Sequence, residues 1–132
     1  MKTIELPRSI LDEITVQARN EAPRECCGIL GGAGNTARTI YPLKNEAAHP
    51  EKEYFASPQE LFRTMRTMRV AGEEMVAIYH SHPNGSAQPS QADLDLAFYR
   101  TIYLIVAVND TIDVRAFELT QAGATETKIV IS

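Results

Sequence analysis

The segment His80-Ser81-His82-Pro83, followed after six residues by Ser90-Gln91-Ala92-Asp93, is the most informative part of this chain. An apolar run from Met75 to His80 predicts a strand that Pro83 interrupts. Alternate strand residues point to one face, so the imidazoles of His80 and His82 are expected to converge on one point.

Asp93 falls in the first turn of a helix predicted from Ser90 to about Tyr99. The loop from Pro83 to Pro89 can return this carboxylate to the two histidines. Two imidazoles and one carboxylate suit one tetrahedral Zn²⁺ whose fourth position is open to a water molecule. Zinc lowers the pKa of such a water to about 7, which makes hydroxide available at neutral pH.

A hydrolytic zinc site also needs a group that moves protons, and Glu25 is the candidate general base and acid. Ser90 is a candidate donor to the oxyanion of a tetrahedral intermediate. Simpler interpretations exist for each residue taken alone. Ser90 and Asp93 also form the pattern of a helix capping box, and a glutamate before a strand is usually a solvated charge.

The rest of the chain predicts helices and strands that interleave, and it ends in a meander of strands. A glycine-rich turn is expected at 31–35. Ser57, with Pro58 next, is expected to begin a helix that Gly72 closes. The other predicted elements are a helix at 7–20 and strands at 26–30, 37–42, 54–55, 102–108, 114–119 and 126–131. We expect a single domain over 1–132 of the α/β (α+β) class, with a mixed central β-sheet flanked by helices.

Composition narrows the class of function. The net charge of −4 argues against a nucleic-acid partner, which usually meets a basic face. Cys26 and Cys27 are adjacent, an arrangement unsuited to a relaxed mutual disulfide, and this favours a reducing, cytoplasmic compartment. Met1 to Ile14 has no apolar signal region, and no run approaches the ~18 apolar residues that a membrane span needs.

The segment from His80 to Asp93 resembles the JAMM (MPN+) signature His-x-His-Pro-x6-Ser-x-x-Asp at every named position. Upstream, Pro23 to Gly32 resembles the segment that carries the catalytic glutamate in small prokaryotic members of that family, and Glu25 falls at its position. The resemblance covers nearly the whole chain. It implies a cytidine-deaminase-like JAMM/MPN fold, zinc held by His80, His82 and Asp93, and Glu25 acting on the zinc-bound water.

The resemblance also implies a substrate class. Family members hydrolyse the peptide or isopeptide bond after the C-terminal Gly-Gly of a ubiquitin-like protein, and small prokaryotic members process sulfur-carrier proteins. Larger deubiquitinating members carry an insertion between the metal-binding helix and the C-terminal strands. The predicted strands leave little room for it after Asp93, so we expect a small leaving group. The oligomeric state is left open.

Two other functions compete with this interpretation. Metal-free MPN domains act as non-catalytic scaffolds, but such domains lose ligands or the glutamate, whereas this sequence keeps all four residues. Zinc deaminases of nucleobases also use a glutamate. They require His-x-Glu and Pro-Cys-x-x-Cys, and neither pattern occurs in this chain.

Overall fold

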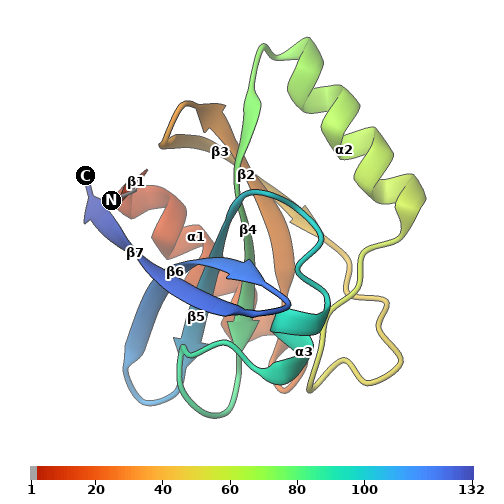
Figure 1. Ribbon diagram of the computed structural model, residues 1–132, viewed down its shortest axis with the longest axis vertical. Helices are drawn as coiled ribbons and strands as arrows, with labels where there is room; N and C mark the ends of the chain where they lie inside the picture. Colours follow the sequence, from red (N-terminus) through yellow and green to blue (C-terminus); the bar gives the residue numbers. More distant parts are fainter. Residues whose placement is uncertain (1–2) are drawn as a thin grey trace.

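The computed structural model describes residues 3–132 (Figure 1); Met1 and Lys2, which the predicted domain includes, lie outside the described residues. Helices and strands interleave in the first two thirds of the chain and strands end it, as expected. The elements are β1 (Thr3–Leu6), α1 (Arg8–Glu21), β2 (Cys27–Ala33), β3 (Thr36–Leu43), α2 (Pro58–Val70), β4 (Glu74–His82), α3 (Gln91–Asp95), β5 (Ile102–Val108), β6 (Ile112–Thr120) and β7 (Gly123–Ile131).

The strands form one mixed sheet that closes on itself in the order β1-β3-β2-β4-β5-β6-β7. Most neighbouring strands pair antiparallel, but β4 pairs parallel with β5, and β1 pairs parallel with both β3 and β7. The predicted mixed sheet is therefore confirmed. Its closure depends on β1, a short strand that was not predicted. This strand pairs with β3 on one side and with β7, the last strand, on the other (Figure 1).

Both faces of the central strands are buried, which explains the continuous apolar run of β5. Leu104 and Val106 belong to the core on the side of α1, which contributes Ile10, Leu11, Ile14 and Ala18. Tyr103, Ile105 and Ala107 belong to the core on the opposite face. On β4, Ala77 and Tyr79 face α1, whereas Ile78 faces the other way, and this alternation aims the two histidines away from α1.

The turn expected at 31–35 is confined to Gly34 and Asn35, because Gly31 and Gly32 lie within β2, where its glycines serve close packing. A Cβ on Gly28 would lie 2.3 Å from the Tyr79 ring, and one on Gly32 would lie 2.0 Å from the Thr36 carbonyl oxygen. The strand therefore continues to Ala33, and Gly34, with a φ of 60°, makes the turn.

Two further expectations were wrong, one about a strand and one about the length of a helix. Residues 54–55 are not a strand: they lie in the irregular segment between β3 and α2. The helix that begins after Ser90 ends at Asp95 and not near Tyr99. In the segment after it, the Tyr103 hydroxyl accepts a hydrogen bond from the Tyr99 amide (3.1 Å) and donates one to the Tyr99 carbonyl (3.3 Å), so this backbone bonds to a side chain instead of continuing the helix.

The predicted start of α2 is confirmed, because the Ser57 side chain accepts a hydrogen bond from the Glu60 amide (3.1 Å). Within this helix only Met68 is buried, so α2 covers an edge of the barrel and leaves most of its surface to solvent (Figure 1). None of the helices within 3–132 has both the length and the apolar character needed to cross a membrane.

Candidate metal centre

Strand β4 positions both histidines, and it extends to His82, two residues past its predicted end. His80 is fully buried and the exposed fraction of His82 is 7%. Backbone pairing holds the strand on both sides, since His80 is paired with Cys27 of β2 and with Ile105 of β5. The expected convergence follows: the two Nε2 atoms lie 3.2 Å apart.

Asp93 reaches the histidines from the first turn of α3. Its Oδ1 lies 3.0 Å from Nε2 of His80, and its Oδ2 lies 3.1 Å from Nε2 of His82. The capping box is also present: the Ser90 amide donates to Asp93 Oδ2 (2.8 Å), and the Asp93 amide donates to Ser90 Oγ (3.1 Å). The simpler interpretation and the site are thus compatible, because the cap orients the carboxylate that faces the histidines.

Glu25 comes to the same place from the segment that precedes β2. The antiparallel pairing of Cys27 with His80 brings the start of β2 to the end of β4. Two hydrogen bonds extend this alignment: the Ser81 amide donates to the Cys26 carbonyl (3.0 Å), and the Cys26 amide donates to Ser81 Oγ (2.8 Å). One donor atom from each of Glu25, His80, His82 and Asp93 lies within 4.8 Å of the others, and all four residues are buried.

The geometry of these donors fits a cation. The Ser86 carbonyl lies 2.8 Å from Nδ1 of His82 and can only accept, so Nδ1 carries a hydrogen and the neutral ring presents a lone pair at Nε2. That lone pair faces a carboxylate and a second imidazole. Zinc bonds of about 2.0–2.1 Å at tetrahedral angles place neighbouring ligand atoms about 3.3 Å apart, close to the separations of 3.0 to 3.2 Å seen here.

Burial shifts the titration of these groups. It raises the pKa of Glu25 to about 8. The charge of His82 lowers this pKa, and the charge of Asp93 raises it further. Burial alone would also raise the pKa of Asp93, but contacts with His80 and His82 and the Ser90 amide hold it well below its usual range. The pKa of His82 is raised, because its bonds to Asp93 and the Ser86 carbonyl outweigh the opposite effect of burial.

The two histidines are oriented by different means. Nδ1 of His82 is fixed by the Ser86 carbonyl, whereas Nδ1 of His80 has no hydrogen-bond partner among residues 3–132. The His80 ring is instead stacked on Tyr54, with ring centroids 4.4 Å apart and an interplanar angle of 26°. The sequence carried no signal for this contact, because Tyr54 lies in an irregular segment whose path depends on tertiary contacts.

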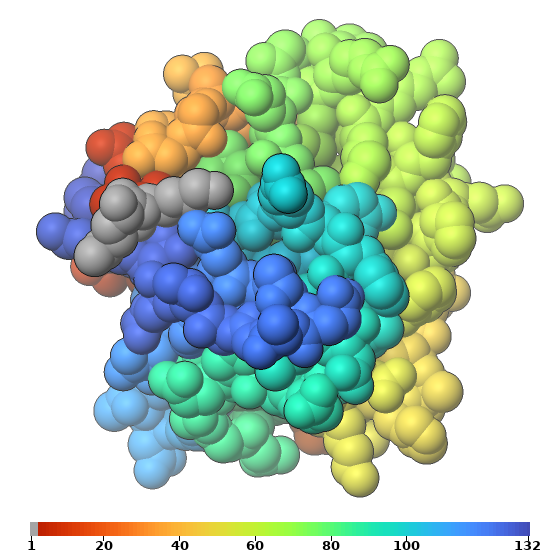
Figure 2. Space-filling view, viewed as in Figure 1, coloured from red at the N-terminus to blue at the C-terminus, as the bar shows by residue number. Residues whose placement is uncertain are grey.

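An apolar cavity of about 220 Å³ is connected to the site through one residue and is lined by none of the four donors. Tyr54 belongs to both, since it lines the cavity and stacks on His80. Cys27, Ile29 and Met75 are part of the cavity wall on the side of the sheet. The cavity lies where the segments before α2 and after α3 come together, and Figure 2 shows α2 and the segment after α3 on neighbouring parts of one face.

Comparison with known proteins agrees with this geometry. Residues 7–120 match the family model described as prokaryotic homologs of the JAB domain. A probable TtuB-protein conjugate cleaving protease of Thermus thermophilus is 37% identical over 114 residues, which cover 86% of this chain and 74% of that protein. A CysO-cysteine peptidase of Mycobacterium tuberculosis is 30% identical over 122 residues, covering 89% of this chain and 83% of that protein.

The fold is also that of a solved structure. A JAB1/MPN domain protein from Archaeoglobus fulgidus superposes with a TM-score of 0.64, at 18% identity, over 98% of this chain and 100% of that one. The predicted JAMM/MPN fold is thereby confirmed. The chain therefore belongs to the family of prokaryotic homologs of the JAB domain, as the JAMM resemblance of its sequence implied, and it is a hydrolase of the JAMM peptidase type.

Proposed function

We propose that this protein is a zinc peptidase that cleaves the bond after the C-terminal Gly-Gly of a ubiquitin-like or sulfur-carrier protein. The observation that carries the proposal is the group of four buried donors, Glu25, His80, His82 and Asp93, within 4.8 Å of one another. A scaffold would have no use for it, because burying two carboxylates and two imidazoles together without a cation or a reaction is costly.

His80, His82 and Asp93 would hold the ion, since two neutral imidazoles and a carboxylate leave a tetrahedral zinc one open position. Zinc bound there would supply Lewis acidity, which polarises a substrate carbonyl and acidifies water. The chain supplies a buried frame for this chemistry, with the histidines on a strand paired on both sides and the carboxylate locked by its capping box.

Glu25 is suited to move the proton. Its Oε1 is buried and makes no hydrogen bond with any group of residues 3–132, so it is free to accept a proton from water and to deliver it to the departing amine. Burial also raises the pKa of this carboxyl to about 8, and a bound cation would lower it again. Such a group changes protonation state near neutral pH, which general acid–base catalysis requires.

Ser90 can serve the cap and the reaction together. Its oxygen accepts the Asp93 amide through a lone pair, which leaves the hydroxyl hydrogen available to a developing oxyanion. The Ser90 hydroxyl can therefore cap α3 and donate to the oxyanion at the same time.

The surroundings fit a small leaving group on a carrier protein. Residues 96–101 alone connect α3 to β5, so there is no room for the insertion with which larger deubiquitinating members hold a second partner. The named relatives act on conjugates of TtuB and on CysO-cysteine, and the second of these carries an amino acid as its adduct.

Two free, buried cysteines suit a reducing compartment, and we place the protein in the cytoplasm.

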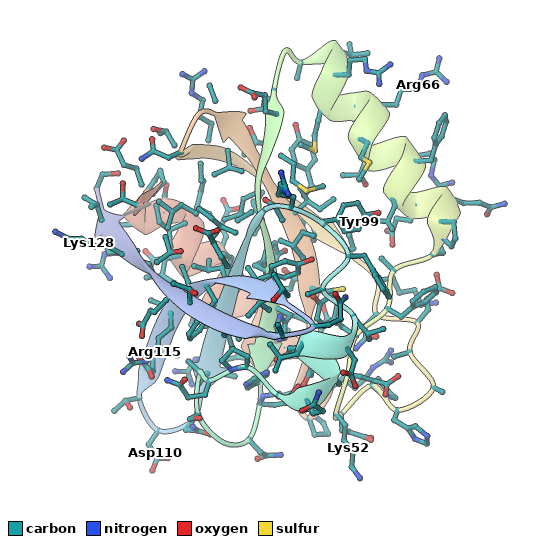
Figure 3. All side chains as sticks on the ribbon, in the orientation of Figure 1. Lys52, Arg66, Tyr99, Asp110, Arg115 and Lys128 are labelled. Carbon is teal, nitrogen blue, oxygen red and sulfur yellow. The ribbon has the colours of Figure 1, made fainter. Side chains whose placement is uncertain are left out.

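The carrier would approach past the apolar cavity and α2. The cavity suits one apolar side chain of the carrier's tail, and the aromatic rings of Phe55 and Phe98 are exposed at its rim. On α2, Arg63, Arg66 and Arg69 are exposed on one side and make no ion pair with any residue from 3 to 132; Arg66 points outward in Figure 3. An acidic carrier would complement this basic stripe on a chain whose net charge is −4.

The test uses Glu25→Gln, which keeps the size of the side chain and removes its proton-accepting group. We expect one zinc per chain in both proteins, and cleavage of a carrier ending in Gly-Gly-Cys that falls at least about 10²-fold in the variant. Zinc content is measured by elemental analysis and cleavage by mass spectrometry. Wild-type protein that binds zinc but cleaves no Gly-Gly-extended carrier would overturn the substrate class, and full activity of Glu25→Gln would overturn the role of Glu25.

A further inference from the structure

We infer that Asn45 is a positioning residue for this site: it fixes the segment between β3 and α2 so that Tyr54 holds the His80 ring, and it ties that segment to Glu25. This inference rests on the proposed function, in which His80 binds the metal and Glu25 moves the proton. It adds two residues, Asn45 and Tyr54, that lie outside the sequence signature.

The rings of His80 and His82 are supported unequally. A metal-binding imidazole normally donates its second ring N–H to a carbonyl or carboxylate, which sets the orientation of the ring. His82 follows this rule through the Ser86 carbonyl, 2.8 Å from its Nδ1. His80 does not, because its Nδ1 has no hydrogen-bond partner within 3–132 although the residue is fully buried.

Tyr54 provides the missing support. Its ring is stacked on the His80 ring at a centroid distance of 4.4 Å, and this contact restricts rotation of the imidazole about its own axis. Tyr54, however, lies in an irregular segment without strand pairing, and such segments are ordinarily more mobile than the elements they join. Stacking orients His80 only if this segment is itself held in place.

Asn45 holds it. Asn45 is 1% exposed, and its side chain bonds to several residues along the segment. Its Nδ2 donates to the Glu53 carbonyl (3.0 Å) and its Oδ1 accepts from the Phe55 amide (3.1 Å), so one carboxamide bonds to the residues on both sides of Tyr54. It also donates to the Pro50 carbonyl (3.3 Å) and accepts from the Ala47 amide (3.0 Å).

The same carboxamide reaches the segment that carries Glu25. Nδ2 of Asn45 donates to the Glu25 carbonyl (2.9 Å), and the Glu25 amide donates to the Pro50 carbonyl (2.7 Å). Arg24 adds a bond from its guanidinium to the Asn45 carbonyl (2.8 Å). One side chain therefore sets the position of the proton-moving residue and, through Tyr54, that of a metal ligand.

Only a carboxamide can fill this position. An aspartate has the same shape, but it offers no hydrogen to the three carbonyl oxygens that now share the two hydrogens of the Asn45 NH₂ group, and it would add a negative charge close to Glu25. A small residue would leave the same carbonyls and two amides without partners in a buried place. Either change should release the segment and disturb both sides of the site.

The first test concerns Tyr54 and is read as zinc affinity, measured by competition with a chromogenic chelator, which needs no substrate. Tyr54→Phe keeps the ring and should bind zinc within about twofold of wild type. Tyr54→Leu removes the stacking and should bind zinc about 10- to 100-fold more weakly, the range found when the outer support of a metal ligand is lost. Equal zinc affinity in Tyr54→Leu and wild type would overturn this part of the inference.

The second test compares Asn45→Asp with Asn35→Asp, the same chemical change at an exposed turn where Asn35 Nδ2 donates to Thr3. We expect Asn45→Asp to lower kcat about 10- to 100-fold on the Gly-Gly-Cys carrier with a smaller change in KM, and to weaken zinc binding. Asn35→Asp should leave all three unchanged. A lower Tm in Asn45→Asp with normal zinc affinity and normal kcat would show a merely structural role.

Asn45→Ser covers the case in which the buried charge of Asn45→Asp prevents folding, since serine keeps one donor and adds no charge. It should fall between wild type and Asn45→Asp in zinc affinity and kcat, and wild-type values in a folded Asn45→Ser would overturn the inference. If wild-type protein binds zinc but does not cleave the carrier, the proposed substrate fails, while the zinc affinities of these variants still decide the present inference.

Discussion

The proposed metal centre has two sides that are built in different ways. On the ligand side, His80, His82 and Asp93 come from one stretch of 80–93 and are held by strand pairing and a helix cap. On the other side, Glu25 and Tyr54 lie in irregular segments far apart in sequence, joined by the side chain of Asn45. Backbone ladders support the first side, and one buried amide supports the second.

The two sides obtain their geometry from different sources. Metal ligands must meet within about 3 Å of one another, and a strand with a period of two residues followed by a capped turn delivers that spacing from local geometry. The proton-moving group must approach from another direction to reach the open position. A distant segment supplies it, and this segment needs contacts that no local pattern specifies.

The largest effect is expected from the ligand side. Asp93→Ala removes a ligand together with the carboxylate half of the capping box, so we expect zinc affinity to fall by more than about 100-fold and cleavage to be lost. Chelator competition and the carrier assay measure the two effects. Asp95→Ala is the matched control, because Asp95 lies in the same helix and, among residues 3–132, its side chain bonds only to Gln91. Zinc retained at wild-type affinity in Asp93→Ala would break the assignment of the ligand side.

A smaller effect separates the two uses of Ser90. Ser90→Ala and Ser57→Ala each remove a helix cap, of α3 and α2, and should each cost about 1 kcal/mol of unfolding free energy. Only Ser90→Ala should also lower kcat, by about 10²-fold, because Ser90 is bonded to Asp93, one of the four buried donors, whereas Ser57 is bonded to Glu60. Urea unfolding and steady-state kinetics give the comparison. Equal kcat in the two variants would reduce Ser90 to a cap.

A third effect is measured as stability against pH and concerns protonation on the Glu25 side. The pKa of Glu25 is raised from 4.5 to about 8 in the folded, metal-free protein, so the folded state binds this proton more tightly than the unfolded state. The resulting stability is complete below about pH 4.5 and is lost as pH rises towards 8, by at most about 1.4 kcal/mol per pH unit.

Glu25→Gln has no titrating group at this position. In chelator-treated protein between pH 5.5 and 7.5, the unfolding free energy of wild type should therefore fall more steeply with pH than that of the variant. Urea unfolding at three pH values measures both slopes. Parallel slopes would mean that Glu25 does not titrate in this range, and they would remove the support that its pKa gives to a role as general base.

Much of the fold could be predicted from particular residues. Ser57 and Pro58 marked the start of α2 because a cap and a proline act within one turn. The apolar run of β5 marked a strand buried on both faces. The short strand β1 was missed, because four residues carry too little periodicity, and its place depends on parallel pairing with β7 at the far end of the chain.

The errors have the same physical origin. Gly31 and Gly32 were expected to belong to a turn, yet they lie within β2, where the Tyr41 ring and the Thr36 backbone come too close for a Cβ. Helix α3 stops early because the Tyr103 hydroxyl bonds to the backbone of Tyr99. In each case the contact that decides the local structure comes from a residue of another element.

The donor set, the residues that present it and the order of most elements could be predicted from the residues in order, because strand alternation, helix caps and turns act over a few residues. The closure of the barrel, the stacking of Tyr54 on His80 and the link that Asn45 makes between Glu25 and that ring became visible only in the folded chain. The physical reason is that these contacts join segments whose separation along the chain erases any periodic signal, so only the folded packing brings them together.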